Sequence, residues 1–137
     1  MKILGLDIGT KNIGVAVSDP MELIASGREN IFRKSDESAL VAIKALVAED
    51  NIELIVVGLP VNMDGSSGLR AKDAEEFAKK IEHATGINVF LWDERLSTRE
   101  AENLLITADV SRKKRKLVKD KLAAQLILQG YLDSKNS

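Results

Sequence analysis

The feature that most restricts the fold of this chain is the apolar run Ile52–Val57, which is rich in β-branched residues and interrupted only by Glu53. Such a run is typical of a strand that is buried on both faces. Gly58-Leu59-Pro60 ends it, and Ile87–Trp92 is a second run of the same kind. A sheet containing such strands must be covered by helices, so we expect an α/β protein.

The other predicted elements fit around these two strands. Ile3–Asp7 and Ile13–Ser18 are predicted to pair as a hairpin, with a third strand at about Ser26–Phe32. Helices are predicted at Asp36–Asp50, at about Arg70–Thr85 with Gly86 as its stop, from the capping box Ser97–Glu100 to about Ile106, and from the basic run to about Asp133. This order predicts one mixed sheet flanked by helices, and 137 residues fit a single domain over 1–137.

Composition restricts the chemistry. The chain has no cysteine, so disulfides, thiolate metal sites and cysteine nucleophiles are excluded, and its only histidine is His83. A bound metal would therefore take oxygen ligands, which favour Mg²⁺ or Mn²⁺. No apolar stretch approaches the roughly 20 residues of a membrane span, and Asp7 interrupts the N-terminal run too early for a signal peptide. We expect a cytoplasmic protein with no membrane partner.

Positive charge is concentrated near the C-terminus. Asp109–Lys121 contains seven basic and two acidic residues, a net charge of +5 in a chain whose total is −1. An isolated charge run is usually a solvated face, but a basic stretch on an acidic body can also orient the protein toward a polyanion.

Three carboxylates stand out by position. Asp7 ends an apolar strand between two glycines, where it either caps the following turn or faces a ligand. Glu94 follows the strand Ile87–Trp92, at the strand end where α/β sheets bind ligands. Asp93 competes with it, because strand alternation allows at most one of the two to face the site. Asp120 lies on the apolar stripe of the last helix and needs either a basic residue or a metal as its partner.

Four segments carry a resemblance to a known family: Leu6–Asp19, Val57–Gly65, Asp93–Thr98 and Lys119–Ala124. In this order and spacing, they resemble the signature blocks of the YqgF/RuvX family, and the resemblance covers essentially the whole chain. It implies a ribonuclease H-like fold, with a five-stranded mixed β-sheet flanked by α-helices. It also implies that Asp7, Glu94 and Asp120 are the catalytic residues and hold the metal, Mg²⁺ or Mn²⁺, as two ions.

The resemblance further implies a metal-dependent nuclease that hydrolyses phosphodiester bonds in structured RNA or branched DNA. Members are described as nucleases that mature the 5′ end of the 16S ribosomal RNA precursor, or as Holliday junction resolvases. Junction resolution favours a tight two-fold dimer, which needs a second apolar face. The sequence shows no such face, so we expect a monomer or weak homodimer and, with it, the RNA activity. Junction resolution is the alternative, and a non-catalytic nucleic-acid-binding factor is a further one.

The basic residues that we predict to contact substrate are Lys11, Arg70, Arg112, Lys113, Lys114, Arg115 and Lys116. Lys11 lies in the turn after Asp7, where an ordinary solvated lysine is the alternative. The five residues of the 112–116 run would hold phosphates without reading sequence. A last alternative is an ATP-using protein of the actin and sugar-kinase superfamily, since Asp7-Ile8-Gly9-Thr10 is similar to its first phosphate loop. Those enzymes close two such domains over the nucleotide, and this chain provides one.

Overall fold

The computed structural model describes residues 1–60, 68–95 and 112–136, and for residues 112–121 it describes the backbone alone. Its centre is a mixed sheet of five strands. The strands are β1 (Lys2–Ile8), β2 (Asn12–Ser18), β3 (Ala25–Phe32), β4 (Ile52–Leu59) and β5 (Val89–Asp93), and the helices are α1 (Asp36–Asp50), α2 (Leu69–Thr85) and α4 (Arg112–Lys135). The predicted fold class, a five-stranded mixed sheet flanked by helices, is confirmed.

The strand order is β3-β2-β1-β4-β5. The first three strands form an antiparallel meander, and its first turn is closed by the Gly9 amide, which donates to the Asn12 carbonyl at 3.0 Å. Strands β4 and β5 run parallel to β1. The carboxyl ends of β1, β4 and β5 therefore meet at one edge of the sheet, where an α/β sheet positions its ligands.

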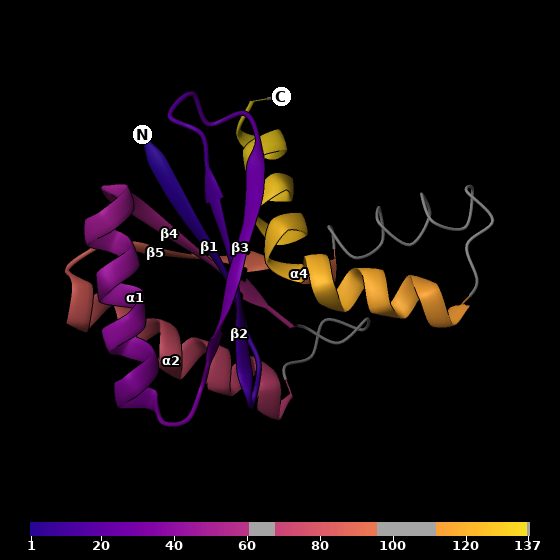
Figure 1. Ribbon diagram of the computed structural model, residues 1–137, viewed down its shortest axis with the longest axis horizontal. Helices are drawn as coiled ribbons and strands as arrows, with labels where there is room; N and C mark the ends of the chain where they lie inside the picture. The colour runs from indigo at the N-terminus through magenta and orange to yellow at the C-terminus, as the bar shows by residue number, and fades with distance from the viewer. Residues whose placement is uncertain (61–67, 96–111, 137) are drawn as a thin grey trace.

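The two faces of the sheet are covered by different helices, with α1 and α2 on one side of the strands and α4 on the other (Figure 1). Strand alternation divides the residues between these faces. Leu4, Leu6 and Ile8 of β1 pack toward α1 and α2, whereas Ile3 packs with the α4 residues. Asp7 therefore lies on the α4 face.

The predicted helix boundaries agree closely with the structure. Ser35 caps α1, because its side chain accepts from the Ser38 amide, and the Ser38 hydroxyl accepts from the Ser35 amide. Gly86 ends α2 in the left-handed conformation, at φ 71°, as predicted for its position. The predicted helix from Ser97 to about Ile106 lies outside the described residues.

The prediction that Ile87–Trp92 is a buried strand was wrong. Strand β5 lies at the edge of the sheet, and Phe90 and Leu91 are 47% and 39% exposed. Phe90 packs edge-on against Tyr131 of α4, with ring centroids 5.2 Å apart, so this apolar residue of β5 is covered by α4 although it remains partly exposed.

Among the described residues, no helix is both long and apolar enough to cross a membrane.

Candidate active site

Glycines on the face of the sheet that α4 covers let this helix lie very close to β1 and β2. A Cβ added to Gly5 would lie 2.7 Å from the Leu128 Cβ, and one added to Gly14 would lie 3.3 Å from the Ala124 Cβ. Real Cβ atoms essentially never lie 2.7 Å apart, and 3.3 Å is closer than almost all of their contacts, so the missing side chains on the strands allow the helix to lie this near. The same Gly14 position is 3.4 Å from the Cβ of Asp7, the residue it pairs with across β1 and β2.

A third glycine makes room for the second carboxylate. A Cβ on Gly58 of β4 would lie 2.7 Å from Glu94 Oε1 and 2.4 Å from Ile127 Cδ1 of α4. The Glu94 side chain therefore folds back from the end of β5 over the backbone of Gly58. Because β1 and β4 are adjacent, this brings Glu94 to the strand that carries Asp7.

Asp7 and Glu94 interact directly. Both side chains are half-buried, and a hydrogen bond joins the Glu94 carboxyl to that of Asp7. Burial and the negative charge of Asp7 raise the pKa of Glu94 from 4.5 to about 8. Two carboxylates in a partly desolvated site repel each other strongly when both are ionised, so the pair keeps one proton near neutral pH. Strongly perturbed acids of this kind are concentrated at functional sites.

The donor chemistry of this pair suits a hard divalent cation. Carboxylate oxygens are the ligands that Mg²⁺ and Mn²⁺ prefer, and a bound cation would offset the repulsion between the two carboxylates. Among the described side chains, no third Asp, Glu or His joins them to make a group of three. The geometry brings two of the three predicted metal ligands together, and their catalytic role remains a prediction.

The choice between Asp93 and Glu94 follows from their partners. The Asp93 carboxylate accepts from Arg95, whose Nη2 lies 2.6 Å from Oδ2, and this bond lowers the pKa of Asp93. Glu94 instead turns to Asp7. The two neighbours thus have different partners, as strand alternation predicted, and Arg95 pairs with the last residue of β5.

The predicted substrate-binding residues Arg70 and Lys11 differ in their relation to the carboxylates. Arg70, exposed on the first turn of α2, is near enough for its charge to oppose the rise in the pKa of Glu94. Lys11 is exposed in the β1–β2 turn, where its carbonyl accepts from the Arg33 amide at 2.7 Å. Within the described part of the chain, no ion pair holds the Lys11 side chain.

The third predicted carboxylate and the basic run are on α4. The helix begins at Arg112 and includes Asp120, which precedes Ala124 by one helical turn. Ala124 packs beside Gly14 and is thus close to Asp7. The side chains of Asp120 and of Arg112–Lys116 lie outside the described residues, so their predicted roles are neither confirmed nor contradicted.

One residue at this end of the sheet was not predicted. The Arg33 side chain is only 9% exposed and binds Asp73 of α2 through two bonds of 2.8 and 2.9 Å. It also donates to the Gly9 carbonyl at 3.0 Å and lies 4.6 Å from the centre of the Phe77 ring. Arg33 therefore ties the turn after Asp7 to the helix that carries Arg70. An arginine between a strand and a helix cap gives no sequence signal of this role, since both partners are distant in the chain.

Known proteins similar to this chain agree on its class. The family model described as "RuvX: Holliday junction resolvase" matches residues 1–134. A protein of Halothermothrix orenii named "Putative pre-16S rRNA nuclease" is 52% identical over 136 residues, which are 99% of this chain and 97% of that protein. One of the same name from Geobacillus sp. strain WCH70 is 53% identical over 137 residues, covering 98% and 99%.

Among solved structures, RuvC of Thermus thermophilus in complex with a Holliday junction substrate superposes with a TM-score of 0.59. The match covers 100% of this chain and 96% of that one at 13% identity, so it bears on the fold alone. It agrees with the predicted ribonuclease H-like fold. The family match over nearly the whole chain, together with these two relatives, each more than half identical, sets aside the sugar-kinase alternative. The chain belongs to the RuvX family of nucleases.

Proposed function

We propose that this protein is a cytoplasmic, metal-dependent nuclease whose catalytic residues are Asp7, Glu94 and Asp120. The observation that carries the proposal is the pairing of Asp7 with Glu94, a half-buried pair of acids whose repulsion is offset only in part by the charge of Arg70. Asp120, one turn before Ala124 on a helix that packs close to Asp7, is the third member. We further propose that residues 1–137 form one nuclease domain.

Each residue has a defined task in this proposal. Asp7 and Glu94, with Asp120, hold Mg²⁺ or Mn²⁺ as two ions. Bound divalent ions activate water and stabilise the charge that develops on the phosphoryl oxygens. Arg70, on the first turn of α2, and Lys11, in the β1–β2 turn, hold the phosphates of the strand that is cut. Glu94 must lose its proton for the site to act.

We propose RNA as the substrate, at the 5′ end of the 16S ribosomal RNA precursor. The relatives from Halothermothrix orenii and Geobacillus sp., both more than half identical to this chain, carry a pre-16S rRNA nuclease name. Resolution of Holliday junctions is the second candidate, because the family description names that activity and the superposed RuvC holds a junction. A resolvase needs two active sites in fixed symmetry. We propose instead a monomer or weak homodimer that cuts one strand at a time.

The basic run Arg112–Lys116 is proposed to bind phosphates. Each phosphate contact removed should reduce the log–log salt slope of nucleic-acid binding by about 0.7–0.9 unit. Replacing all five residues by alanine and measuring affinity across a salt series tests this. An unchanged slope would assign the run to a solvated face.

The cleavage experiment compares a precursor 16S rRNA 5′ end with a four-way DNA junction, each with and without Mg²⁺. We expect the wild-type protein to cut the RNA, and Asp7→Asn, Glu94→Gln and Asp120→Asn to abolish cleavage while remaining folded. Glu53→Gln is the matched control, since Glu53 is an exposed carboxylate on β4 away from the pair. Wild-type cleavage by any of the three variants would remove that residue from the mechanism.

Sedimentation at micromolar concentration accompanies the panel. Paired symmetric nicks in the junction by a tight dimer would make resolution the function. Binding of nucleic acid without Mg²⁺-dependent cleavage of either substrate would favour a non-catalytic factor.

A further inference from the structure

A groove opens beside Asp7, between strands β2 and β3 and the helix α4. Its volume is about 380 Å³, and the residues around it include Gly14, Gly27, Asn30, Ala124 and Gln125. Pockets that bind small organic groups start at about 300 Å³, so the groove has room for one nucleoside.

The groove exists because the strands carry little bulk on this face. Gly14 is part of its floor and adjoins Asp7, so the groove begins at the candidate active site. Gly27 leaves the next position open, since a Cβ there would meet only Gln125 Oε1, at 3.3 Å. On the other side of Asp7, the space over Gly58 is filled by Glu94 and Ile127. From Asp7, the α4 face of the sheet is therefore filled toward β4 and open toward β3.

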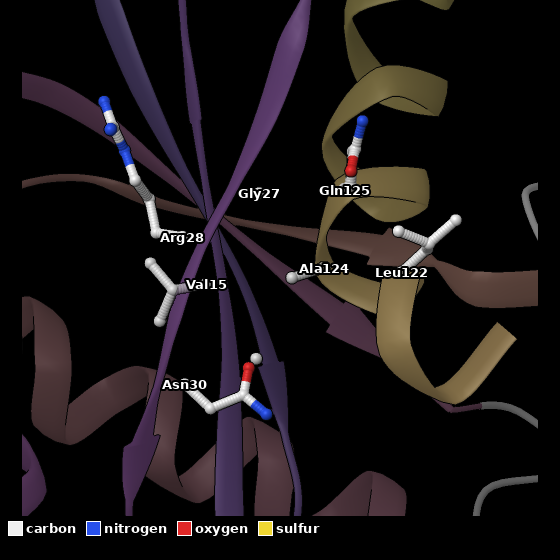
Figure 2. Close-up of a pocket in the computed structure, with 8 residues that line it drawn as sticks. Val15, Gly27, Arg28, Asn30, Leu122, Ala124 and Gln125 are labelled. Carbon is white, nitrogen blue, oxygen red and sulfur yellow. The ribbon is translucent and has the colours of Figure 1, made fainter. Parts of the chain in front are cut away.

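The polar side chains that face the groove are neutral amides. Asn30 points from β3 toward α4 and Gln125 lies beside Gly27, whereas the Arg28 guanidinium points away from α4 (Figure 2). Asn30 is exposed and Gln125 half-buried, and in the described part of the chain neither amide has a hydrogen-bond partner. An amide offers both donors and an acceptor, which match a ribose hydroxyl or a base edge better than a phosphate.

We propose that this groove binds the ribose and base of the nucleotide next to the cleaved phosphodiester, through Asn30 and Gln125. The inference rests on the proposed function, because a phosphodiester at Asp7 requires its flanking nucleotide to leave toward the open side. A nucleotide held there is unpaired, since its base lies between the sheet and α4. The groove thereby selects single-stranded RNA at the cleavage position.

The first test observes the amides directly. The side-chain NH₂ signals of Asn30 and Gln125 are followed by NMR in isotope-labelled protein without metal, and assigned through Asn30→Ala and Gln125→Ala. Single-stranded RNA with the precursor 5′ sequence is added to saturation. We expect both signals to shift, with smaller shifts for the DNA of the same sequence. The exposed Asn88 side chain, outside the groove, is the internal control.

The second test fills the groove. Gly27→Leu should lower kcat/KM for RNA by about tenfold or more. Ser26→Leu, which places the same side chain on the opposite face of β3, should leave it unchanged. Unshifted amide signals at saturation, or wild-type kinetics for Gly27→Leu, would overturn the groove as a binding site. Amide shifts without RNA cleavage would instead overturn the proposed function and retain the groove, so the two failures are distinguishable.

Discussion

The two faces of the sheet are packed in different ways. Toward α1 and α2, large aliphatic residues from β1, β2 and β4 meet Ile43, Phe77 and Ile81 in one continuous core. Toward α4, the strands contribute glycines and few large side chains, and the second apolar cluster is smaller. Asp7 and Glu94 are both on this second face.

The difference shows how one sheet can carry both stability and a charged site. A carboxylate in the first core would be desolvated among aliphatic side chains at a large cost. On the α4 face, Gly14 and Gly58 leave space around each carboxylate, and the helix that covers the face carries Asp120 itself. We infer that stability depends mainly on the first face and activity on the second.

The largest expected effect is on the first face. Ile43→Ala removes a fully buried side chain between α1 and the sheet, and should lower the free energy of unfolding by about 2–5 kcal/mol. Cleavage per folded molecule should be unchanged, because Ile43 lies on the face opposite Asp7. Urea unfolding and a cleavage assay at low temperature measure the two quantities. A loss of activity in the folded fraction would contradict the inference that the first face determines stability and the second face activity.

A smaller loss of stability is expected from adding one methyl group to the second face. Gly5→Ala would place a Cβ 2.7 Å from that of Leu128, so α4 must shift. Such overpacking costs about 1–3 kcal/mol, and cleavage should fall as well, because α4 carries Asp120. Gly27→Ala is the matched control for stability alone, since its new Cβ meets only the flexible end of Gln125. Equal stability in the two variants would contradict the account of the helix position.

The sequence predicted the strands well, because alternation and apolar runs are local signals. It could not show which neighbour of the pair Asp93 and Glu94 turns inward, since that depends on Arg95 and on the space over Gly58. The exposure of β5 depends on its place at the sheet edge, which no local pattern gives. Arg33 was missed for the same reason, as its partner Asp73 is 40 residues away.

The smallest expected effect is the pH dependence of the free energy of unfolding that Glu94 causes. Glu94 has a pKa of about 8 in the folded protein against an ordinary 4.5, so the folded state binds its proton more tightly. The resulting stabilisation is fully present below about pH 4.5, declines as the pH rises, and is lost above about pH 8. In metal-free protein, we expect a loss of about 1–2 kcal/mol across this range for a half-buried group.

Glu94→Gln cannot ionise and should flatten this dependence. Thermal unfolding in a chelator from pH 5 to pH 9 compares the two proteins, and the variant should be the more stable one at the alkaline end. Parallel curves for both proteins would mean that neither burial nor Asp7 raises the pKa of Glu94.

Metal binding by calorimetry tests the central claim most directly, that Asp7 and Glu94 together form a divalent-cation site. Mn²⁺ is titrated into metal-free wild-type protein and into Asp7→Asn, Glu94→Gln and Asp93→Asn. The last is the matched control, because an asparagine at 93 still accepts from Arg95. We predict binding by the wild type and by Asp93→Asn, and its loss in the other two. Wild-type affinity in Asp7→Asn or Glu94→Gln, or an equal loss in Asp93→Asn, would contradict the account.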